Sequence, residues 1–197
     1  KQREGAIVTN FKEEGPAKNA HTSGEEPTLS VSDYGPPSTD KAAEIVAAYP
    51  SAAPIANEIV ALAAKLEMPD AGWLANLMNF ETGGTFDPST KNALGSGATG
   101  LIQFMPFTAR SLGTTTTALA KMTAKEQMVY VEKYLMQFKK NSKSYSQPTD
   151  VYMAVFYPWA MGKSRDVSLA EHWAKQKSGR TPEQFTRVNP GIVTAQD

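Results

Sequence analysis

The stretch from Asn79 to Ala109, NFETGGTFDPSTKNALGSGATGLIQFMPFTA, contains the features from which the fold class and the function are best inferred. It opens at the end of an apolar helical run, where one acid, Glu81, closely precedes two glycines. A later apolar segment, GLIQF, contains a single amide, Gln103. Burying a carboxylate or an amide without a partner is costly, so a lone polar residue in each segment calls for an explanation.

In the helix expected before the two glycines, Trp73, Leu74, Leu77 and Glu81 follow helical spacing. Glu81 is therefore predicted to lie on the apolar face of this helix rather than on its solvent face. A carboxyl group buried there without a partner has a raised pKa and keeps its proton, as a general acid requires near neutral pH. The alternative is that Glu81 turns outward at a frayed helix end.

Helical signals dominate residues 40–197 and predict an all-α fold, or a mainly α fold with a small β-hairpin in the polar segment 82–100. Caps and breakers delimit the expected helices. The first three are 41–49 between Asp40 and Pro50, 54–67 with Pro54 in its first turn, and 71–81 between Asp70 and the glycines Gly83 and Gly84. A capping box of Thr123 and Glu126 opens the next, 124–140, and a further helix from 149 is kinked or ended by Pro158. Another helix is opened by Ser168 and Glu171 and closed by Gly179, and a last turn begins at Thr181 and Pro182.

Residues 1–39 differ in composition from the rest of the chain. They contain four prolines, several acidic pairs and few large apolar residues, and no helical or strand period persists in them. This composition is typical of an extended linker or docking arm. Residues 40–197 are expected to form the domain.

The composition of the 197-residue chain excludes several classes of protein. Cysteine is absent and there are only two histidines, His21 and His172, so neither a metal site nor a Ser-His-Asp triad is expected. We predict no cofactor. No apolar run approaches the roughly eighteen residues needed to cross a bilayer, and no signal peptide is recognisable, so we predict no membrane insertion.

The formal net charge is zero, but the charges are unevenly distributed. Residues 1–70 contain 6 Lys/Arg and 11 Asp/Glu, and residues 71–197 contain 14 and 9. The cationic part suits an anionic polymer, although ordinary solvated helix faces explain it equally well. There is no dense basic run with interleaved aromatic residues, so nucleic-acid binding is not predicted.

Three segments carry a resemblance to a known family: ETGGTF with Glu81, GLIQFMPFTA, and AVFYPWAMGK with Tyr157. In order and spacing they resemble the catalytic Glu motif, the G-L-M-Q and M-P-x-T-A motifs, and the A-Y-N motif of SLT-type lytic transglycosylases, which are relatives of goose-type lysozyme. The matching residues of the second segment are Gln103, Met105, Pro106, Thr108 and Ala109.

The resemblance covers about residues 70–165 and is strongest to the phage-encoded branch, the tail lysozymes and endolysins. The segment TAKEQMVYVEKYL looks like the helix that follows the second motif in those proteins. The third motif departs from the family, because Pro158 stands where the family usually has Asn. The resemblance therefore does not extend to the saccharide contact of that Asn.

The resemblance implies a lysozyme-like helical domain that cleaves the MurNAc-GlcNAc β-1,4 bond of bacterial peptidoglycan. Glu81 would act first as general acid and then as base, because the N-acetyl group and the 6-hydroxyl of the substrate replace a second carboxylate. Asp87 is the alternative second carboxylate, which would make the enzyme a hydrolase of the muramidase type. Its setting, FDPS, is equally typical of a plain turn.

Five further residues are candidates for substrate binding. Gln103 can bind the sugar, or it can be a satisfied amide in a tight turn. Tyr157 is expected to orient Glu81 by a hydrogen bond, or to be a core aromatic residue with a solvated hydroxyl. Three further aromatic residues are candidate sugar platforms, although aromatic residues at helical spacing are more often core: Phe104, Tyr130 and Trp159.

The resemblance also implies where the protein acts. Its partners would be peptidoglycan glycan strands and, through residues 1–39, other proteins of a phage tail. It would be a virion protein or a released lysis enzyme that acts on the bacterial cell wall or in the periplasm. The alternative from a different class is a non-catalytic lysozyme-like module that binds the cell wall or serves as a structural piece of a tail.

Overall fold

The computed structural model describes residues 39–197 except 94, 142, 193 and 195–197. The predicted arm, residues 1–39, therefore lies outside the described residues except for its last position. Within the described residues the fold is all-α, with nine α-helices, two short 3₁₀ helices and isolated β-bridges in place of any strand. No helix in this part of the chain is long and apolar enough to cross a membrane.

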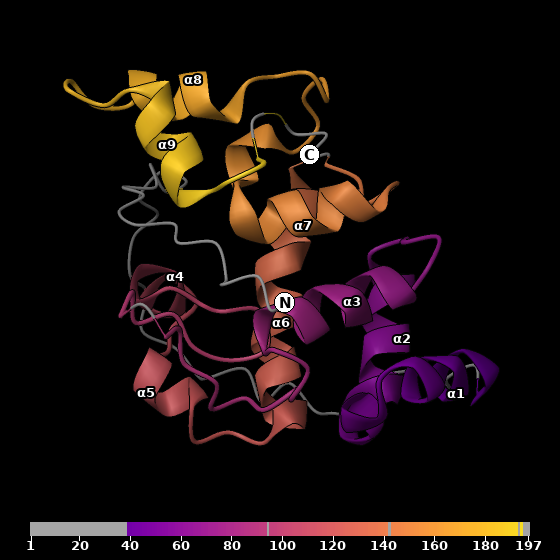
Figure 1. The fold of residues 1–197 in the computed structure, drawn as a ribbon. Helices are drawn as coiled ribbons and strands as arrows, with labels where there is room; N and C mark the ends of the chain where they lie inside the picture. The colour runs from indigo at the N-terminus through magenta and orange to yellow at the C-terminus, as the bar shows by residue number, and fades with distance from the viewer. Residues whose placement is uncertain (1–38, 94, 142, 193, 195–197) are drawn as a thin grey trace.

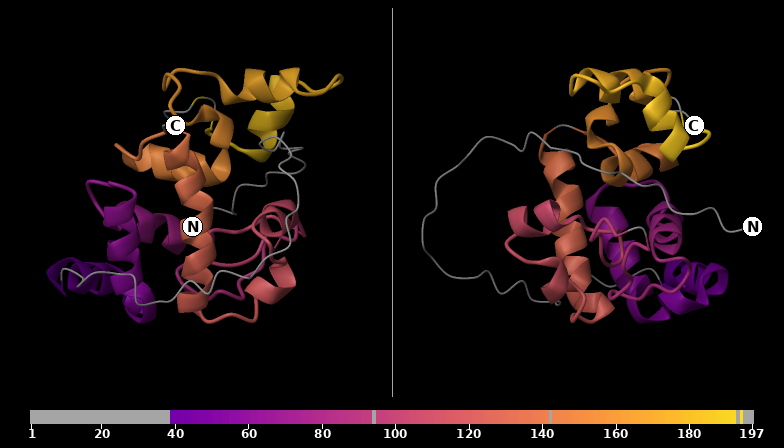
Figure 2. Two further views of the ribbon diagram at one scale, coloured as in Figure 1. Left: turned by 180° about the vertical axis from the view of Figure 1, so that it is seen from behind. Right: turned by 60° about the vertical axis from the view of Figure 1, so that its left-hand side comes forward.

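The helices form two lobes, and α6 (Ala124–Lys140) runs through the N-terminal one and reaches α7 (Pro148–Phe156) of the other (Figure 1). Figure 2 shows the same arrangement from two other directions. The N-terminal lobe comprises α1 (Thr39–Ala48), η2 (Pro50–Ile55), α2 (Ala56–Lys65), α3 (Gly72–Glu81), α4 (Pro106–Ser111) and α5 (Thr116–Leu119). The C-terminal lobe comprises α7 (Pro148–Phe156), η3 (Pro158–Ala160), α8 (Leu169–Lys175) and α9 (Pro182–Val188). The lobes meet where α3 packs against α7.

Helix α6 begins and packs as its sequence predicts. The backbone N–H of Glu126 donates to the Thr123 hydroxyl at 3.3 Å, and the Glu126 carboxylate accepts from the Thr123 backbone N–H at 2.7 Å. This is a capping box, which satisfies donors that the first helical turn leaves free. Met128, Val131 and Leu135 are fully buried along one face, and the main helix contacts of α6 are with η2 and α2 of the N-terminal lobe.

The helix predicted over 54–67 begins later and ends earlier than expected. Pro50 and Pro54 both lie in the 3₁₀ helix η2, and α2 starts only at Ala56. Proline has no N–H to donate and restricts the residue before it, so two prolines four positions apart favour the short tighter helix over an α-helix. The end of α2 at Lys65 is followed by Glu67 in the left-handed conformation, with φ +57°.

The C-terminal lobe follows the predicted caps with one difference. Helix α7 ends at Phe156, two residues before Pro158, as proline requires. The Ser168 hydroxyl caps α8, but α8 ends at Lys175, four residues before Gly179. Among the described residues of the polar segment 82–100, where the sequence permits a hairpin, the β pairing is limited to isolated bridges. Thr99 bridges to Lys91 and to Phe104.

Candidate active site

Glu81 is the last residue of α3, and the backbone beyond it is fixed by hydrogen bonds. The Gly83 N–H donates to the Phe80 carbonyl at 3.3 Å, and the Gly84 N–H donates to the Asn79 carbonyl at 2.8 Å. This pair of bonds is a Schellman motif, whose left-handed residue is Gly83 with φ +61°. The helix end is therefore capped, and the frayed-end alternative for Glu81 is wrong.

Thr82, the next residue, ties the following loop to the helix. Its buried hydroxyl donates to the Met78 carbonyl at 2.7 Å and accepts from the Phe86 N–H at 3.0 Å. Phe86 is itself buried, with φ +51°. The backbone on the C-terminal side of Glu81 is thus held both by the helix cap and by the buried Thr82 side chain. The backbone position from which the Glu81 side chain extends is therefore fixed.

The Glu81 side chain is half-buried and has no hydrogen bond or ion pair with any of the described residues. Burial raises its pKa from the ordinary 4.5 to about 8. Desolvation penalises the charged form of a carboxyl, and no described donor or cation offsets that penalty here. The predicted rise in pKa is confirmed, and Glu81 is expected to be protonated at neutral pH.

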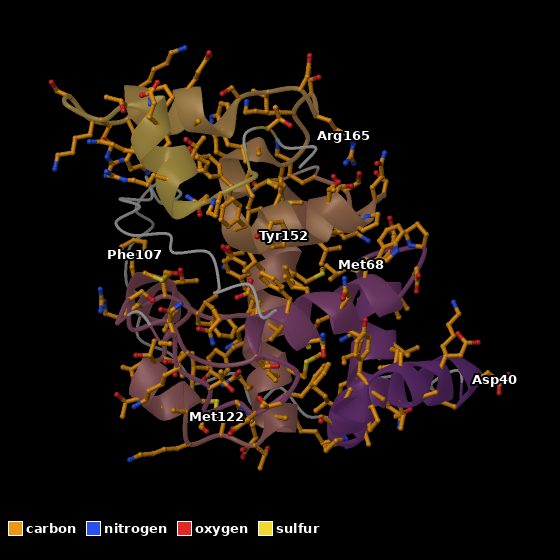
Figure 3. The ribbon with its side chains drawn as sticks, in the orientation of Figure 1. Asp40, Met68, Phe107, Met122, Tyr152 and Arg165 are labelled. Atoms are coloured by element: carbon orange, nitrogen blue, oxygen red, sulfur yellow. The ribbon has the colours of Figure 1, made fainter. Side chains whose placement is uncertain are left out.

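Tyr152 on α7 lies beside Glu81, and the sequence analysis missed it. Burial raises the pKa of Tyr152, and the negative charge of an ionised Glu81 raises it further. The Tyr152 ring stacks on Phe156 with centroids 5.2 Å apart and meets Phe80 edge-on at 6.0 Å. Figure 3 places Tyr152 where α7 faces α3. The signal for this residue is its i, i+4 spacing with Phe156, which puts both rings on the same face of α7.

Tyr157, in contrast, makes its hydrogen bond to His172 of α8 and not to Glu81. Its hydroxyl is 2.8 Å from Nδ1 of His172, its ring is fully buried, and no hydrogen bond joins it to Glu81. The predicted role of Tyr157 in orienting Glu81 is therefore wrong. The reason is Pro158: α7 ends before it, and the extended backbone of Tyr157, with φ −148° and ψ 73°, directs the side chain toward α8.

Gln103 lies in a tight turn with φ +52°. Its Nε2 donates to the carbonyls of Thr90 and Gly100, both at 3.1 Å. The amide nitrogen is thus satisfied within the turn, as one of the two sequence interpretations held. Its carbonyl oxygen Oε1 accepts no hydrogen bond from the described residues, so this oxygen is the part of Gln103 that a ligand could use.

Gln127 on α6 is a second residue that the sequence analysis missed. It is fully buried, and its Oε1 accepts from the Leu101 N–H at 2.6 Å. Its Nε2 donates to the carbonyls of Pro88 and Leu119 at 3.1 and 3.0 Å. One side chain therefore holds both ends of the segment from 88 to 101 and the end of α5. The signal was available, because position 127 lies four before Val131 on the apolar face of α6.

Gly100 allows the close approach between this segment and Gln127. Its φ is +93°, and a Cβ atom there would lie 2.3 Å from the Gln127 Oε1. Only glycine fits this combination of backbone conformation and contact. The structure of the turn that carries Gln103 thus explains the first residue of GLIQF, Gly100.

The three candidate sugar platforms have different surroundings. Phe104 is 2% exposed and meets Tyr134 edge-on at 6.2 Å, so it is a core residue and its prediction as a platform is wrong. Tyr130 is half-buried on α6, with Lys133 Nζ 5.1 Å from its ring centroid. Trp159 is exposed on η3 and stacks on His172 at 3.4 Å. These contacts do not link Tyr130 or Trp159 to Glu81.

Asp87 has the geometry of a turn residue. Its carboxylate accepts from the Ser89 N–H at 2.7 Å, and the hydrogen bonds from Ser89 lower its pKa. Asp87 is exposed and ionised at neutral pH, and burial alone accounts for the raised pKa of Glu81. Asp87 and Glu81 are therefore electrically independent, which favours the turn interpretation of Asp87.

Neither a metal-binding cluster nor a comparison with known proteins adds a role to this site. Among the described residues, no group of three or more His, Asp or Glu side chains could hold a metal ion. No protein-family model, curated protein or solved structure matches the chain. The described residues thus form an all-α fold in which Glu81, at a capped helix end, has a pKa raised to about 8, and the function is argued from that residue.

Proposed function

We propose that the chain cleaves the MurNAc-GlcNAc β-1,4 bond of bacterial peptidoglycan, with Glu81 as the single general acid and base. The observation that carries the proposal is the protonated Glu81 carboxyl at a rigid helix end, without a partner among the described residues. Glycosidic cleavage requires a proton on the leaving oxygen. A pKa of about 8 keeps that proton available at neutral pH.

The second step of the proposed reaction uses the substrate itself. Glu81 gives its proton to the leaving glycosidic oxygen as the bond from that oxygen to the anomeric carbon breaks. The 6-hydroxyl oxygen of MurNAc then attacks the anomeric carbon, and its proton returns to Glu81. The product carries a 1,6-anhydro ring. The turn geometry and independent charge of Asp87 support this scheme over one with a second carboxylate.

We further propose that the protein belongs to the SLT-type and goose-type lysozyme-like family and works in a phage tail or lysis apparatus. The motif residues around Glu81 and Gln103 support this assignment. Its partners would be glycan strands and, through residues 1–39, other tail proteins. The non-catalytic alternative, a wall-binding module, differs from the main proposal in one measurable respect, which is whether bonds are cut.

The test is incubation of the purified protein with peptidoglycan sacculi, followed by mass spectrometry of the soluble products. We expect muropeptides that carry the 1,6-anhydro ring. Products that end in reducing muramic acid would instead indicate hydrolysis. If the protein sediments with the sacculi and releases nothing, the wall-binding module is the better description and the proposed cleavage is wrong.

The pH dependence of stability is expected to reveal the buried proton of Glu81. Between about pH 4.5 and 8 the folded protein holds a proton that the unfolded chain has released. The free energy of unfolding attributable to this group therefore falls as the pH rises through that window, and levels off above it. Melting temperatures of the parent and of Glu81→Gln, compared from pH 4 to pH 9, should diverge in this range in favour of Glu81→Gln. Parallel curves would show that the carboxyl has an ordinary pKa.

Asp87→Asn is expected to leave cleavage and its products unchanged. Asn keeps the side-chain oxygen that accepts from Ser89, so the cost in stability should be below about 1 kcal/mol. Initial rates on sacculi and the mass of the released products measure the effect. An inactive variant that remains folded would make Asp87 the activating base for water and the enzyme a muramidase.

A further inference from the structure

Tyr152 presents a polar group without a partner at the edge of a packed aromatic cluster. Its ring is fixed by Phe156 on one face and by Phe80 at its edge, at 5.2 and 6.0 Å between centroids. Its hydroxyl makes no hydrogen bond with the described residues, although the side chain is half-buried. The hydroxyl has no partner among the described residues to displace, so a ligand group that accepts its hydrogen would gain a hydrogen bond here.

Phe80 supplies an apolar surface next to the same place. It directly precedes Glu81 and is 44% exposed, so its ring is open to a ligand. Its contact with Tyr152 fixes the exposed ring relative to the hydroxyl. An acid, a hydroxyl donor and an exposed aromatic ring thus occur together where α3 meets α7.

We propose that Tyr152 donates a hydrogen bond to the sugar residue held at Glu81, and that Phe80 packs against the apolar C–H face of that sugar. A pyranose ring has polar edges and apolar faces, and this pair of side chains complements both. The inference rests on the proposed function and adds to it two substrate-contacting residues that the family motifs in this chain do not include.

The Tyr152 hydroxyl remains a donor throughout the reaction. Burial and the charge that develops on Glu81 both raise its pKa, so the phenol stays neutral when Glu81 has given up its proton. Tyr152 can therefore hold the sugar both before and after bond cleavage. It binds the substrate and does not replace Glu81 as the acid.

The experiment measures binding of a purified (GlcNAc-MurNAc)₂ tetrasaccharide by calorimetry, in the non-cleaving background Glu81→Gln. Adding Tyr152→Phe removes one hydroxyl and keeps the ring contacts with Phe80 and Phe156. We expect affinity to fall about five-fold, which corresponds to one hydrogen bond. The matched control is Tyr49→Phe in the same background, because the Tyr49 hydroxyl bonds to Asn76 instead. The control should bind as tightly as Glu81→Gln.

A second pair of variants tests the apolar contact. Phe80→Ala in the Glu81→Gln background should weaken binding about ten-fold through loss of buried ring area. Phe107→Ala is its control, since Phe107 is similarly exposed, at 48%, but lies on α4 (Figure 3). Equal affinity losses at positions 80 and 107 would contradict a specific contact with Phe80.

The outcomes separate this inference from the proposed function. If the parent releases muropeptides and Tyr152→Phe leaves the affinity unchanged, the enzyme stands and the contact with Tyr152 is wrong. If the parent releases nothing and Glu81→Gln binds no tetrasaccharide, the proposed function fails and the inference fails with it. Retained melting temperature in Tyr152→Phe, measured alongside, assigns any loss of affinity to the hydroxyl rather than to unfolding.

Discussion

Glu81→Gln is expected to abolish most peptidoglycan cleavage, with a loss of about 10²–10⁴-fold in rate and a retained fold. Gln has the same shape as a protonated Glu and cannot give up a proton, so only the acid is removed. The side chain has no hydrogen bond or ion pair with the described residues, so the substitution breaks no described contact. The rate is measured as release of soluble muropeptides from sacculi, and the fold by circular dichroism.

The matched control for this variant is Glu44→Gln, the same change at an exposed position of α1. It should cleave at the parental rate. Activity of Glu81→Gln within a factor of about two of the parent would exclude Glu81 as the general acid. Loss of activity in both variants would point to a general effect of charge rather than to acid catalysis.

Gln127→Leu is expected to cause the largest loss of stability among single substitutions around the site. Leucine fills the space but leaves the Leu101 N–H and the carbonyls of Pro88 and Leu119 without their partner in a buried position. At about 1–3 kcal/mol for each buried unsatisfied group, partly relieved by local relaxation, we expect a loss of about 3–5 kcal/mol. Urea denaturation at neutral pH measures it.

Two further variants make this test specific. Gln137→Leu makes the same change on the same helix, at a half-buried side chain without a described hydrogen bond, and should change stability by no more than about 0.5 kcal/mol. Gly100→Ala places a Cβ atom 2.3 Å from the Gln127 Oε1 and should destabilise the protein by a similar mechanism. A Gln127→Leu variant as stable as Gln137→Leu would show that the segment 88–101 is held by other contacts.

The features that the sequence predicted well are local ones. The capping box of α6, the stop of α7 before Pro158 and the glycine cap after Glu81 each depend on residues within a few positions of one another. The burial of Glu81 also follows from spacing along one helix. Short-range sterics and hydrogen bonds decide these features, and both can be evaluated from the order of residues alone.

The features that the sequence did not predict depend on how distant segments pack. Tyr157 and Tyr152 belong to the same segment, and the path of the backbone at Pro158 decides which of them reaches Glu81. Phe104 stands next to Gln103 but packs inward against Tyr134. Gln127 has three partners outside its helix, of which Pro88 and Leu101 are far away in sequence. No local periodicity identifies such partners.

The Schellman motif after α3 and the contact between α3 and α7 would form at different stages of folding. The motif joins residues within 79–84, whereas the contact joins helices that are far apart in sequence. Contacts between distant segments close large loops and are generally the slower ones to form. Glu81 would therefore acquire its helix end early, as an ordinary ionised carboxylate, and its proton only when the two lobes dock. Refolding near pH 7 should therefore include the uptake of a hydrogen ion from solution at the stage when α3 docks on α7.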